Sequence, residues 1–395
     1  MREMKDSGIE WCGNIPVSWS SKHNKYVMSK KKVICTKYHG DEILSLTMKG
    51  VIERDLDAGG KMPSSFDGYQ FVYPNNLLMC LFDYDVTPRC IGLVKQQGLV
   101  SPAYSQFVLN EGYYAPYYYY YYLLIDNTKE LLHLAKNLRH SFTEEQLGNI
   151  NVPVPPFEEQ RKIADFLDQK CTEIDALTAD IQTQIETLEE YKKSVITEAV
   201  TKGLDPNVEM KDSGVEWIGK IPKDWGIIPV KFCFSITNGS DPRSDEGDTP
   251  VYGSGKGHFK TCKEFKKGPT VLLGRKGTVN IPQWIEGNYW NVDTAFDVHA
   301  KGNYLLKLFF YAASCFDYDN YSTQTALPSM TQSNYLNFRI PFMNVEEQRQ
   351  IVDFLDQKCA EIDQTISEKQ QQLETLAEYK KSLIYEYVTG KKEVA

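Results

Sequence analysis

The chain has 395 residues, of which 42% are hydrophobic and 25% are charged, and its formal net charge at pH 7 is −9. A chain of this length forms about two to three domains, and its composition is ordinary for a globular protein. No apolar run approaches the roughly 18–20 residues of a membrane helix, and the polar start, MREMKDSG, lacks the apolar core of a signal peptide. We therefore expect a cytoplasmic protein with no membrane partner.

Two segments of the chain occur twice. The opening MREMKDSGIEWCGNIPVSW returns as VEMKDSGVEWIGKIPKDW, so that Met4 matches Met210 and Trp19 matches Trp225. A second pair begins with EEQRKIADFLDQK at Glu158 and with EEQRQIVDFLDQK at Glu346. The stretches between them, roughly 20–150 and 226–340, show no obvious match. Such repeats predict one duplicated frame that carries two unlike inserts.

The first insert contains short β-type runs, EILSLTMKGVIERDL, GYQFVYPNNLLMCLFD and DVTPRCIGLVKQQGLVSPAYSQFVLN, separated by turn residues. The run LLHLAKNL is typical of a short helix. The tyrosines at 117–122 have two interpretations, because aromatic rings stack on nucleic-acid bases but also fill cores. We favour burial in a strand or helix. The insert is thus expected to be an irregular α+β globule.

The repeated segment after the first insert predicts a long helix. Leu167, Ile174, Ile181, Leu188 and Val195 recur every seven residues, and further apolar residues fill intermediate positions: Leu177, Ile185 and Tyr191. This stripe is typical of a helix that packs along another helix. Pro155 and Pro156 precede it and Gly203 suits its end. About 43 residues of helix span about 64 Å.

The second insert contains the β-type runs GDTPVYGSGKGHF, GPTVLLGRKGTVNIPQW and YWNVDTAFDVHA, and a predicted helix, YLLKLFFYAASCF. GSGKG resembles a phosphate-binding loop but lacks its full spacing, and VPPF at 154–157 lacks the amide or carboxylate of an amino-methyltransferase motif. Nine cysteines without a C-x-x-C pair, and six histidines without a ligand spacing, argue against disulfide and metal sites. No cofactor site is therefore expected.

The second long repeat completes the frame. Leu355, Ile362, Leu376 and Leu383 continue the stripe, and Lys369 interrupts it, while Gly390 suits the helix end. Cys171 and Cys359 take equivalent positions, where we expect small buried thiols. Two such helices would pair, and the duplication predicts a pseudo-two-fold body with one insert toward each end. That geometry suits duplex DNA, where half-sites lie about 34 Å apart.

Charge is unevenly distributed along the chain. Residues 20–150 contain 14 basic against 13 acidic residues and residues 226–340 contain 12 against 10, whereas 158–203 contain 6 against 11. An insert this weakly basic would bind DNA poorly alone, because phosphate neutralisation supplies most of the affinity. A partner must then contribute positive charge. We predict these DNA-binding residues, mostly in glycine-flanked loops: Lys49, Arg54, Arg89, Tyr104, Gln106, Lys136, Arg139, His140, Arg275, Lys276, Thr278 and Asn280.

With these motifs the chain resembles the specificity subunit of type I restriction–modification systems over essentially its whole length. The resemblance rests on KDSGIEWCGNIPVSW and KDSGVEWIGKIPKDW before the inserts, and on VPVPPFEEQRKIADFLDQK and IPFMNVEEQRQIVDFLDQK after them. The segments ETLEEYKKSVITEAVTKG and ETLAEYKKSLIYEYVTGK add to it. One departure is PFMNVEEQ, where the family often has a second Pro-Pro pair.

The resemblance implies an α+β fold, with two target recognition domains joined by two long, antiparallel paired helices in a coiled coil. It divides the chain into recognition domains at 1–150 and 204–340, each with its preceding segment, and helical spacers at 151–203 and 341–395. It further implies that the inserts read the two halves of a bipartite, asymmetric DNA site. The chain itself would be non-catalytic. Two methyltransferase subunits would methylate adenine N6, and restriction subunits would cleave.

Two other functions remain open from the residues alone. A self-contained DNA methyltransferase would bind S-adenosylmethionine, but no glycine-rich strand–turn–helix segment for that cofactor is present. A coiled-coil scaffold without a nucleic-acid role would show no sequence-dependent DNA binding even beside its partners.

Overall fold

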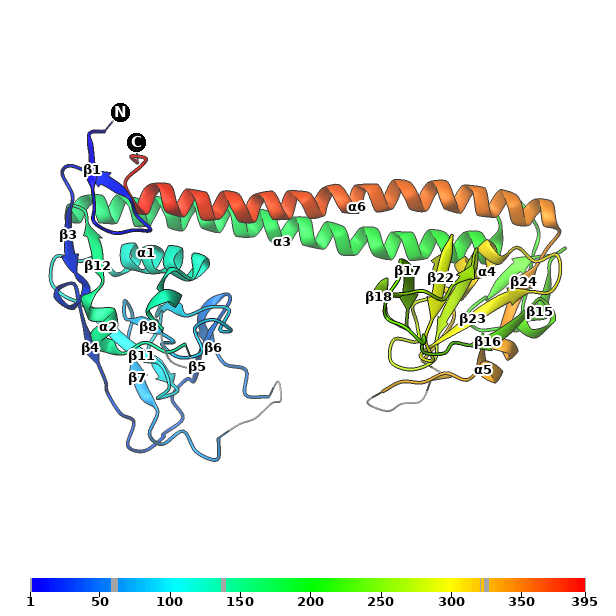
Figure 1. Cartoon of the computed structure of the whole chain (residues 1–395), viewed down its shortest axis with the longest axis horizontal. Coiled ribbons are helices and arrows are strands. Elements are labelled where there is room, and N and C mark those ends of the chain that lie inside the picture. Colours follow the sequence, from blue (N-terminus) through cyan, green and yellow to red (C-terminus); the bar gives the residue numbers. More distant parts are fainter. Residues whose placement is uncertain (1, 58–62, 136–139, 320, 323–326, 395) are drawn as a thin grey trace. The chain divides into compact units, whose positions relative to one another are not determined.

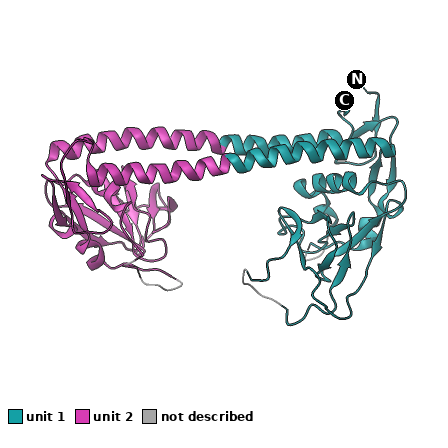
Figure 2. Ribbon diagram, turned by 180° about the vertical axis from the view of Figure 1, so that it is seen from behind, with its two compact units in different colours: residues 1–180, 371–395 teal, residues 181–370 magenta. Residues whose placement is uncertain are grey.

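The computed structural model describes residues 2–57, 63–135, 140–319, 321–322 and 327–394. It divides into two compact units (Figure 2), of which unit 1 comprises Met1–Asp180 with Gln371–Ala395 and unit 2 comprises Ile181–Gln370. Both boundaries fall inside long helices, α3 (Phe157–Lys202) and α6 (Val345–Val388). Each unit therefore combines one insert with half of each long helix.

The two long helices run antiparallel in both units. In unit 2, Lys192 Nζ of α3 lies 2.6 Å from Asp363 Oδ2 of α6. In unit 1, Lys380 Nζ of α6 lies 2.5 Å from Asp175 Oδ1 of α3. Residues of α3 nearer its C-terminus therefore contact residues of α6 nearer its N-terminus, as in an antiparallel pair. The predicted α+β fold with long paired helices is confirmed.

The predicted stripe of apolar residues is only partly buried. Leu167, Ile174, Ile181 and Ile185 are buried, as are Cys171 and Cys359, so the expected buried thiols are confirmed. In contrast, Leu177 and Tyr191 are each 48% exposed, so their predicted place in the stripe was wrong. A helix turns 3.6 residues per turn and drifts away from a strict seven-residue repeat, which moves such flanking positions to the outer face.

In unit 1 a four-stranded antiparallel sheet carries the first insert. Its order is β4 (Met28–Lys31), β11 (Ser105–Leu109), β8 (Leu77–Met79) and β9 (Ile91–Leu93). Helix α1 (Ala115–Thr128) lies between this sheet and the long helices (Figure 1). Smaller pairs surround the sheet: β5 (Leu44–Thr47) with β6 (Gly50–Glu53), and β7 (Gln70–Val72) with β10 (Gly98–Val100).

Unit 2 repeats the order of this four-stranded sheet with unrelated residues, but its remaining strands pair differently. Its first sheet has the order β16 (Phe234–Asn238), β23 (Ala295–Ala300), β20 (Thr270–Gly274) and β21 (Gln283–Ile285). Helix α4 (Leu306–Ala313), which lies within a predicted helix, packs on β20 and β21. A second sheet has the order β18 (His258–Cys262), β17 (Thr249–Tyr252), β22 (Asn288–Asn291) and β19 (Lys266–Lys267).

Matching short elements connect sheets and frame in both units. In unit 1 these are β1 (Met4–Asp6), β2 (Asn14–Pro16), β3 (Ser20–His23), η1 (Asn24–Tyr26), α2 (Glu144–Asn149) and β12 (Asn151–Val154), whereas η2 (Glu130–Leu134) has no counterpart among the described elements of unit 2. In unit 2 these are β13 (Met210–Asp212), β14 (Lys220–Pro222), β15 (Gly226–Pro229), η3 (Val230–Phe232), α5 (Gln332–Asn337) and β24 (Arg339–Phe342). The run LLHLAKNL, predicted as a short helix, begins as the short 3-10 helix η2, and its last residues lie outside the described part of the chain.

The segment before each insert packs on the end of a long helix. Trp19 is 1% exposed and its indole Nε1 donates to Glu159 Oε2 at 2.9 Å, while Trp225 is 2% exposed and donates to Glu347 Oε1 at 2.9 Å. Gly390, with φ +71°, follows the end of α6 and lies against Pro16 and Trp19, where a Cβ would come within 2.5 Å of Pro16 Cδ, so the close approach requires glycine. The duplicated motif thus builds the same joint in each unit.

The tyrosine run fills the core of unit 1. Tyr117, Tyr118, Tyr120, Tyr121 and Tyr122 of α1 are buried, so the predicted burial is confirmed. Tyr120 Oη donates to Asp168 Oδ1 of α3 at 2.6 Å. Unit 2 makes the same connection between Tyr311 of α4 and Asp356 of α6. The two inserts therefore attach to the duplicated frame in the same way, despite their unlike sequences.

Candidate nucleic-acid interface

A rigid loop follows strand β20 in unit 2 and contains four of the predicted DNA-binding residues. The Arg275 amide donates to Thr294 O at 2.7 Å, and the Gly277 amide donates to Pro328 O at 2.8 Å. From beneath, the buried Tyr335 hydroxyl donates to Gly274 O at 2.7 Å and also lies 3.0 Å from Val279 O. These hydrogen bonds hold the loop backbone at Gly274, Arg275, Gly277 and Val279. Gly277 has φ +81°, a conformation that suits glycine.

The side chains of this loop differ in their availability. Lys276 and Asn280 are exposed, and neither side chain has a hydrogen-bond or ion-pair partner among the described residues. Arg275 is half-buried, and its Nη1 contacts Asp293 through the main-chain oxygen at 3.3 Å and the carboxylate at 3.9 Å. Thr278 is half-buried. Such a loop presents a free ammonium and a free amide on a fixed backbone, which suits phosphate and base-edge contacts respectively.

In unit 1 the predicted residues Lys49, Arg54 and Tyr104 lie at or near the surface. Lys49 is exposed in the turn between β5 and β6, where its amide donates to Thr47 Oγ1 at 3.1 Å. Arg54 is half-buried just after β6, and its amide donates to Ile43 O at 2.8 Å. Tyr104 packs against two apolar clusters, and burial raises its pKa. Lys49 is the most accessible of the three.

The remaining predicted residues of unit 1 make internal contacts or lie outside the described residues. Gln106 is fully buried and its amide donates to Asn76 Oδ1, so it serves packing inside the sheet. Arg89 lies beside the buried carboxylate of Asp126, with 4.0 Å between Nε and Oδ2. His140 Nδ1 lies 2.8 Å from Asp85 Oδ2. Lys136 and Arg139 are outside the described residues. Because Gln106 is buried in this way, we do not propose it as a base contact.

A lysine-rich segment was missed when the sequence was read by motif. Residues 20–40 contain six lysines and no acidic residue. Lys22, Lys25, Lys30, Lys31 and Lys32 are all exposed on β3, β4 and the residues beside them. Because β4 is an edge strand, lysines there also discourage pairing with other sheets. A count of charges in windows of about 20 residues would have found this positive surface.

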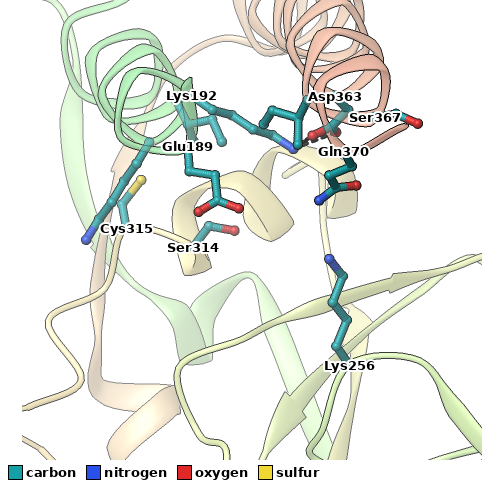
Figure 3. Close-up of a pocket in the computed structure, with 11 residues that line it drawn as sticks. Glu189, Lys192, Lys256, Ser314, Cys315, Asp363, Ser367 and Gln370 are labelled. Carbon is teal, nitrogen blue, oxygen red and sulfur yellow. Dashed lines mark hydrogen bonds and ion pairs between the residues drawn. The ribbon is translucent and has the colours of Figure 1, made fainter. Parts of the chain in front are cut away.

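The loop GSGKG connects β17 to β18 and borders a cavity of about 410 Å³ below the long helices of unit 2. Figure 3 shows Lys256 of this loop pointing toward the helices, where Lys192 meets Asp363 and Glu189 points into the same space. Ser314 and Cys315 also line this cavity. Basic and acidic groups alternate here, so the cavity does not resemble the cationic cradle of a phosphate loop.

Neither a metal centre nor a membrane helix is found in the part of the chain that the structure describes. No group of three or more His, Cys, Asp or Glu side chains has a metal-binding arrangement within these residues. Likewise, none of the described helices combines the length and the apolar character needed to cross a membrane.

Two inserts of unlike sequence share the order of one four-stranded sheet and are attached by equivalent joints to a duplicated frame of two long helices, which defines a duplicated α+β protein with two unlike inserts. The chain belongs to the type I restriction modification DNA specificity domain family, whose model matches residues 102–187 and 222–375, more than half of the chain. It is thus a specificity subunit of a type I restriction–modification system.

Two relatives from Methanocaldococcus jannaschii carry the same description. The chain is 27% identical over 312 residues to the putative type I restriction enzyme MjaX specificity subunit, covering 71% of this chain and 68% of that protein. It is 37% identical over 91 residues to the type I restriction enzyme MjaVIII specificity subunit, covering 23% of this chain and 20% of the relative.

Solved structures show the same fold at low identity. A structure that describes complex assembly and conformational transition of the type I R-M system has a TM-score of 0.73 and 13% identity, covering 96% of this chain and 99% of that chain. The HsdS subunit from Thermoanaerobacter tengcongensis has a TM-score of 0.51 and 15% identity, covering 96% and 98%.

Proposed function

We propose that the two inserts of this specificity subunit read the two halves of a bipartite, asymmetric DNA site. The proposal rests on one observation: the two inserts share the order of a four-stranded sheet but have unlike sequences. One four-stranded sheet has the same strand order in both inserts, and both inserts have the same joints to the frame, yet their remaining strands and loops differ. Loops on a constant scaffold are where recognition varies. Two different readers on one duplicated frame would select two different half-sites.

The rigid loop 275–280 is our candidate reader in unit 2. Asn280 suits an adenine edge, and Arg275 suits a guanine edge if it leaves Asp293. Lys276 would contact phosphate. In unit 1 we propose Lys49 and Arg54 as DNA-contacting residues. The exposed lysines at 22–32 would contact the phosphate backbone of the DNA.

The long helices would set the gap between the half-sites. α3 is one uninterrupted helix of 46 residues, and each insert is attached to a different half of it. Helices are stiff over this length, so the number of helical residues would decide how many unread base pairs separate the halves.

Catalysis would reside in partners. We propose that two methyltransferase subunits dock on the helices and methylate adenine N6, and that restriction subunits join them. The helical repeats are acidic, with 11 acidic against 6 basic residues in 158–203. Basic partner surfaces would fit them and would add the positive charge that DNA binding requires.

The test is genome-wide mapping of N6-methyladenine in a methylation-free host that expresses this chain with its methyltransferase subunit. The expected result is methylation confined to one asymmetric, two-part motif with a fixed gap. Methylation without a motif, from a verified complex, would contradict the proposal and favour a scaffold. Methylation by this chain alone would favour an enzyme.

A further inference from the structure

A lysine followed by an exposed aromatic residue occurs at the same position in both inserts. In the register of the duplicated opening segments, Lys25 corresponds to Lys231 and Tyr26 corresponds to Phe232. Tyr26 is 60% exposed and Phe232 is 64% exposed, and they end the equivalent short helices η1 and η3. The buried residues that directly follow differ between the two units. Packing therefore does not account for the exposed pair that both units share.

In unit 1 two neighbours hold the lysine in place. Lys25 Nζ lies 5.5 Å from the centre of the Tyr26 ring and donates to Asn149 Oδ1 at 3.3 Å. Asn149 is the last residue of α2, and η1 is fixed beside it because the Asn24 amide donates to Ile150 O at 2.8 Å. An ammonium group has three donors, so the bond to Asn149 leaves two for a ligand. Lys25 is thus a positioned cation beside an exposed ring.

Unit 2 builds the same arrangement. Lys231 Nζ lies 5.7 Å from the centre of the Phe232 ring and donates to Asn337 Oδ1 at 3.4 Å. Asn337 is the last residue of α5, and it corresponds to Asn149 in the register of the second duplicated segment. The lysine, the ring and the amide are therefore shared by two inserts whose sequences otherwise differ.

The surroundings of the site in unit 2 are basic. Three segments meet there, joined by the hydrogen bond from the Lys301 amide to Cys233 O and by the pairing of β15 with β24: residues 226–239, 298–305 and 332–342. They contain Lys231, Lys301 and Arg339 and no acidic residue. All three basic side chains are exposed, and none forms an ion pair with another residue that the structure describes.

The surroundings of the site in unit 1 are basic as well. Residues 20–40 contain six lysines and no acidic residue. Three carboxylates lie on neighbouring elements, Glu111 after β11 and Glu144 and Glu145 in α2, and Glu144 is already paired with Lys30. Basic groups thus exceed acidic groups at both sites. An excess of cations beside an exposed aromatic ring is the composition of a surface that binds nucleic acid.

The site in unit 2 shares a short helix with the candidate reading loop. The Tyr335 hydroxyl of α5 donates to Gly274 O, and Asn337, two residues further along α5, holds Lys231. Duplex DNA carries one negative charge per about 1.7 Å of its axis. A base pair that is held at the loop therefore brings phosphates toward the cation that the same helix positions.

We infer that Lys25 with Tyr26, and Lys231 with Phe232, form one contact in each unit to the sugar–phosphate backbone of DNA, whatever its base sequence. This inference rests on the proposed reading of DNA by the inserts. Each lysine pairs with a phosphate, and each ring lies against the adjoining deoxyribose. The reading loops differ because the half-sites differ, whereas the backbone is the same in both half-sites. A shared contact on unlike inserts follows from that difference.

The test measures DNA binding by the complex of the full chain with its methyltransferase subunit, using fluorescence anisotropy over a series of salt concentrations. One duplex carries the mapped motif and a second carries the same bases in scrambled order. Lys25→Gln and Lys231→Gln remove the charge but keep a donor for the asparagine. Each is expected to weaken binding to both duplexes by the same factor and to lower the salt slope by about one, and the double variant by about two.

Three further variants of unit 2 separate charge, ring and general effects. Lys231→Arg keeps the cation and should keep the wild-type slope. Phe232→Ser should weaken binding to both duplexes without changing the slope. Lys223→Ala is the matched control, because it removes an exposed lysine of the same unit that is paired with Glu209 at 2.9 Å, and it should leave both affinity and slope unchanged.

The outcomes distinguish this inference from the proposed function. If the wild-type complex does not prefer the duplex with the motif, the proposed reading itself fails. If the wild type prefers the motif but both glutamine variants keep its affinity and slope, or if Lys223→Ala lowers the slope equally, reading stands and this inference is overturned. Relaxation of a base in the motif would make the site a reader of bases. Loss of the methyltransferase subunit in native mass spectrometry would make it a protein contact, and either result also overturns the inference.

Discussion

Lys192 of α3 and Asp363 of α6 form an ion pair at 2.6 Å, and their counterparts one repeat away, Lys380 and Asp175, form the same pair at 2.5 Å with the helices exchanged. The lysine of each repeat thus meets the aspartate of the other repeat. This exchange is expected when a helix pairs antiparallel with its duplicated copy. Pseudo-two-fold symmetry relates the two contacts, so an ion pair formed in one half of the frame is also formed in the other half.

We predict that these ion pairs contribute little to stability. The side chain of Asp363 is 57% exposed and that of Asp175 is 64% exposed, so water and salt screen both pairs. Lys192→Ala and Lys380→Ala should each lower the free energy of unfolding by less than about 1 kcal/mol. A double-mutant cycle with Asp363→Ala, measured by urea denaturation, checks this. A coupling energy well above that value would show that the pairs hold the helices together.

The tryptophan joints should matter far more. Trp225→Ala removes a buried indole and is expected to cost about 3–5 kcal/mol. Glu347→Gln keeps a hydrogen-bond acceptor for the indole and should cost about 1 kcal/mol. The midpoint of urea denaturation gives the comparison, and equal costs for the two variants would contradict the packing argument. Trp19→Ala should reproduce the larger effect through the equivalent joint of unit 1.

A buried carboxylate ties the two sheets of unit 2 together. Asp297 is fully buried and accepts from Lys266 Nζ at 3.0 Å, Thr270 Oγ1 at 2.6 Å and Tyr289 Oη at 2.8 Å. Asp297→Ala removes the carboxylate partner of Lys266, which keeps only Asn291, and leaves the buried hydroxyls of Thr270 and Tyr289 without this acceptor, so it is expected to cost about 3–5 kcal/mol. The neighbouring Asp293, whose side chain is 51% exposed, is the control, and Asp293→Ala should cost less than about 1 kcal/mol. Similar thermal midpoints for both variants would contradict this.

The buried tyrosines predict alkaline unfolding. Burial raises the pKa of Tyr117, Tyr118, Tyr121 and Tyr122 well above the ordinary value. The folded state therefore holds these protons more tightly than the unfolded state, so the stabilisation is complete below the unfolded pKa of about 10 and is lost as the pH rises above it. Tyrosinate absorbance and far-ultraviolet circular dichroism should change together in one step. Early ionisation of the whole tyrosine run in a folded chain would contradict the burial.

The loop 275–280 of unit 2 holds Lys276, which we expect to contact a phosphate, and Asn280, which we expect to recognise a base. Lys276→Ala should slow methylation at every site and reduce the salt dependence of DNA binding by about one unit of slope, because one phosphate contact is lost. Asn280→Ala should relax one base of one half-site. Methylation mapping of both variants with the methyltransferase subunit checks the pair. A change in both halves of the motif from either variant would contradict the assignment of this loop to one half-site.

Much of the frame was predictable, because its determinants are local. The apolar spacing of 158–203 predicts a helix, and the prolines and glycines mark its ends. The exposure of Leu177 and Tyr191 was not predictable in the same way, because it depends on the exact angle at which each side chain leaves the helix relative to its partner. Neighbouring residues of a helix point in different directions, so a shift of one residue can move a side chain from the core to the solvent.

The inserts were less accessible to sequence reasoning. Their shared strand order is invisible in the residues, because very different apolar sequences satisfy the same packing. Among the candidate site residues, Gln106 was predicted to lie at the surface because its side chain is polar. Only the neighbouring strands reveal that it faces Asn76 inside the sheet. Lys276 and Asn280 were easier to predict because glycines flank their loop.

The central claim is that each insert reads its own half of one DNA site, and an exchange experiment tests it most directly. Residues 226–340 would be replaced by the corresponding insert of another specificity subunit, and N6-methyladenine would be mapped with the same methyltransferase subunit. The account predicts that one half of the motif changes while the other half and the gap stay the same. A change in both halves, or in neither, from a complex with normal subunit composition would contradict it.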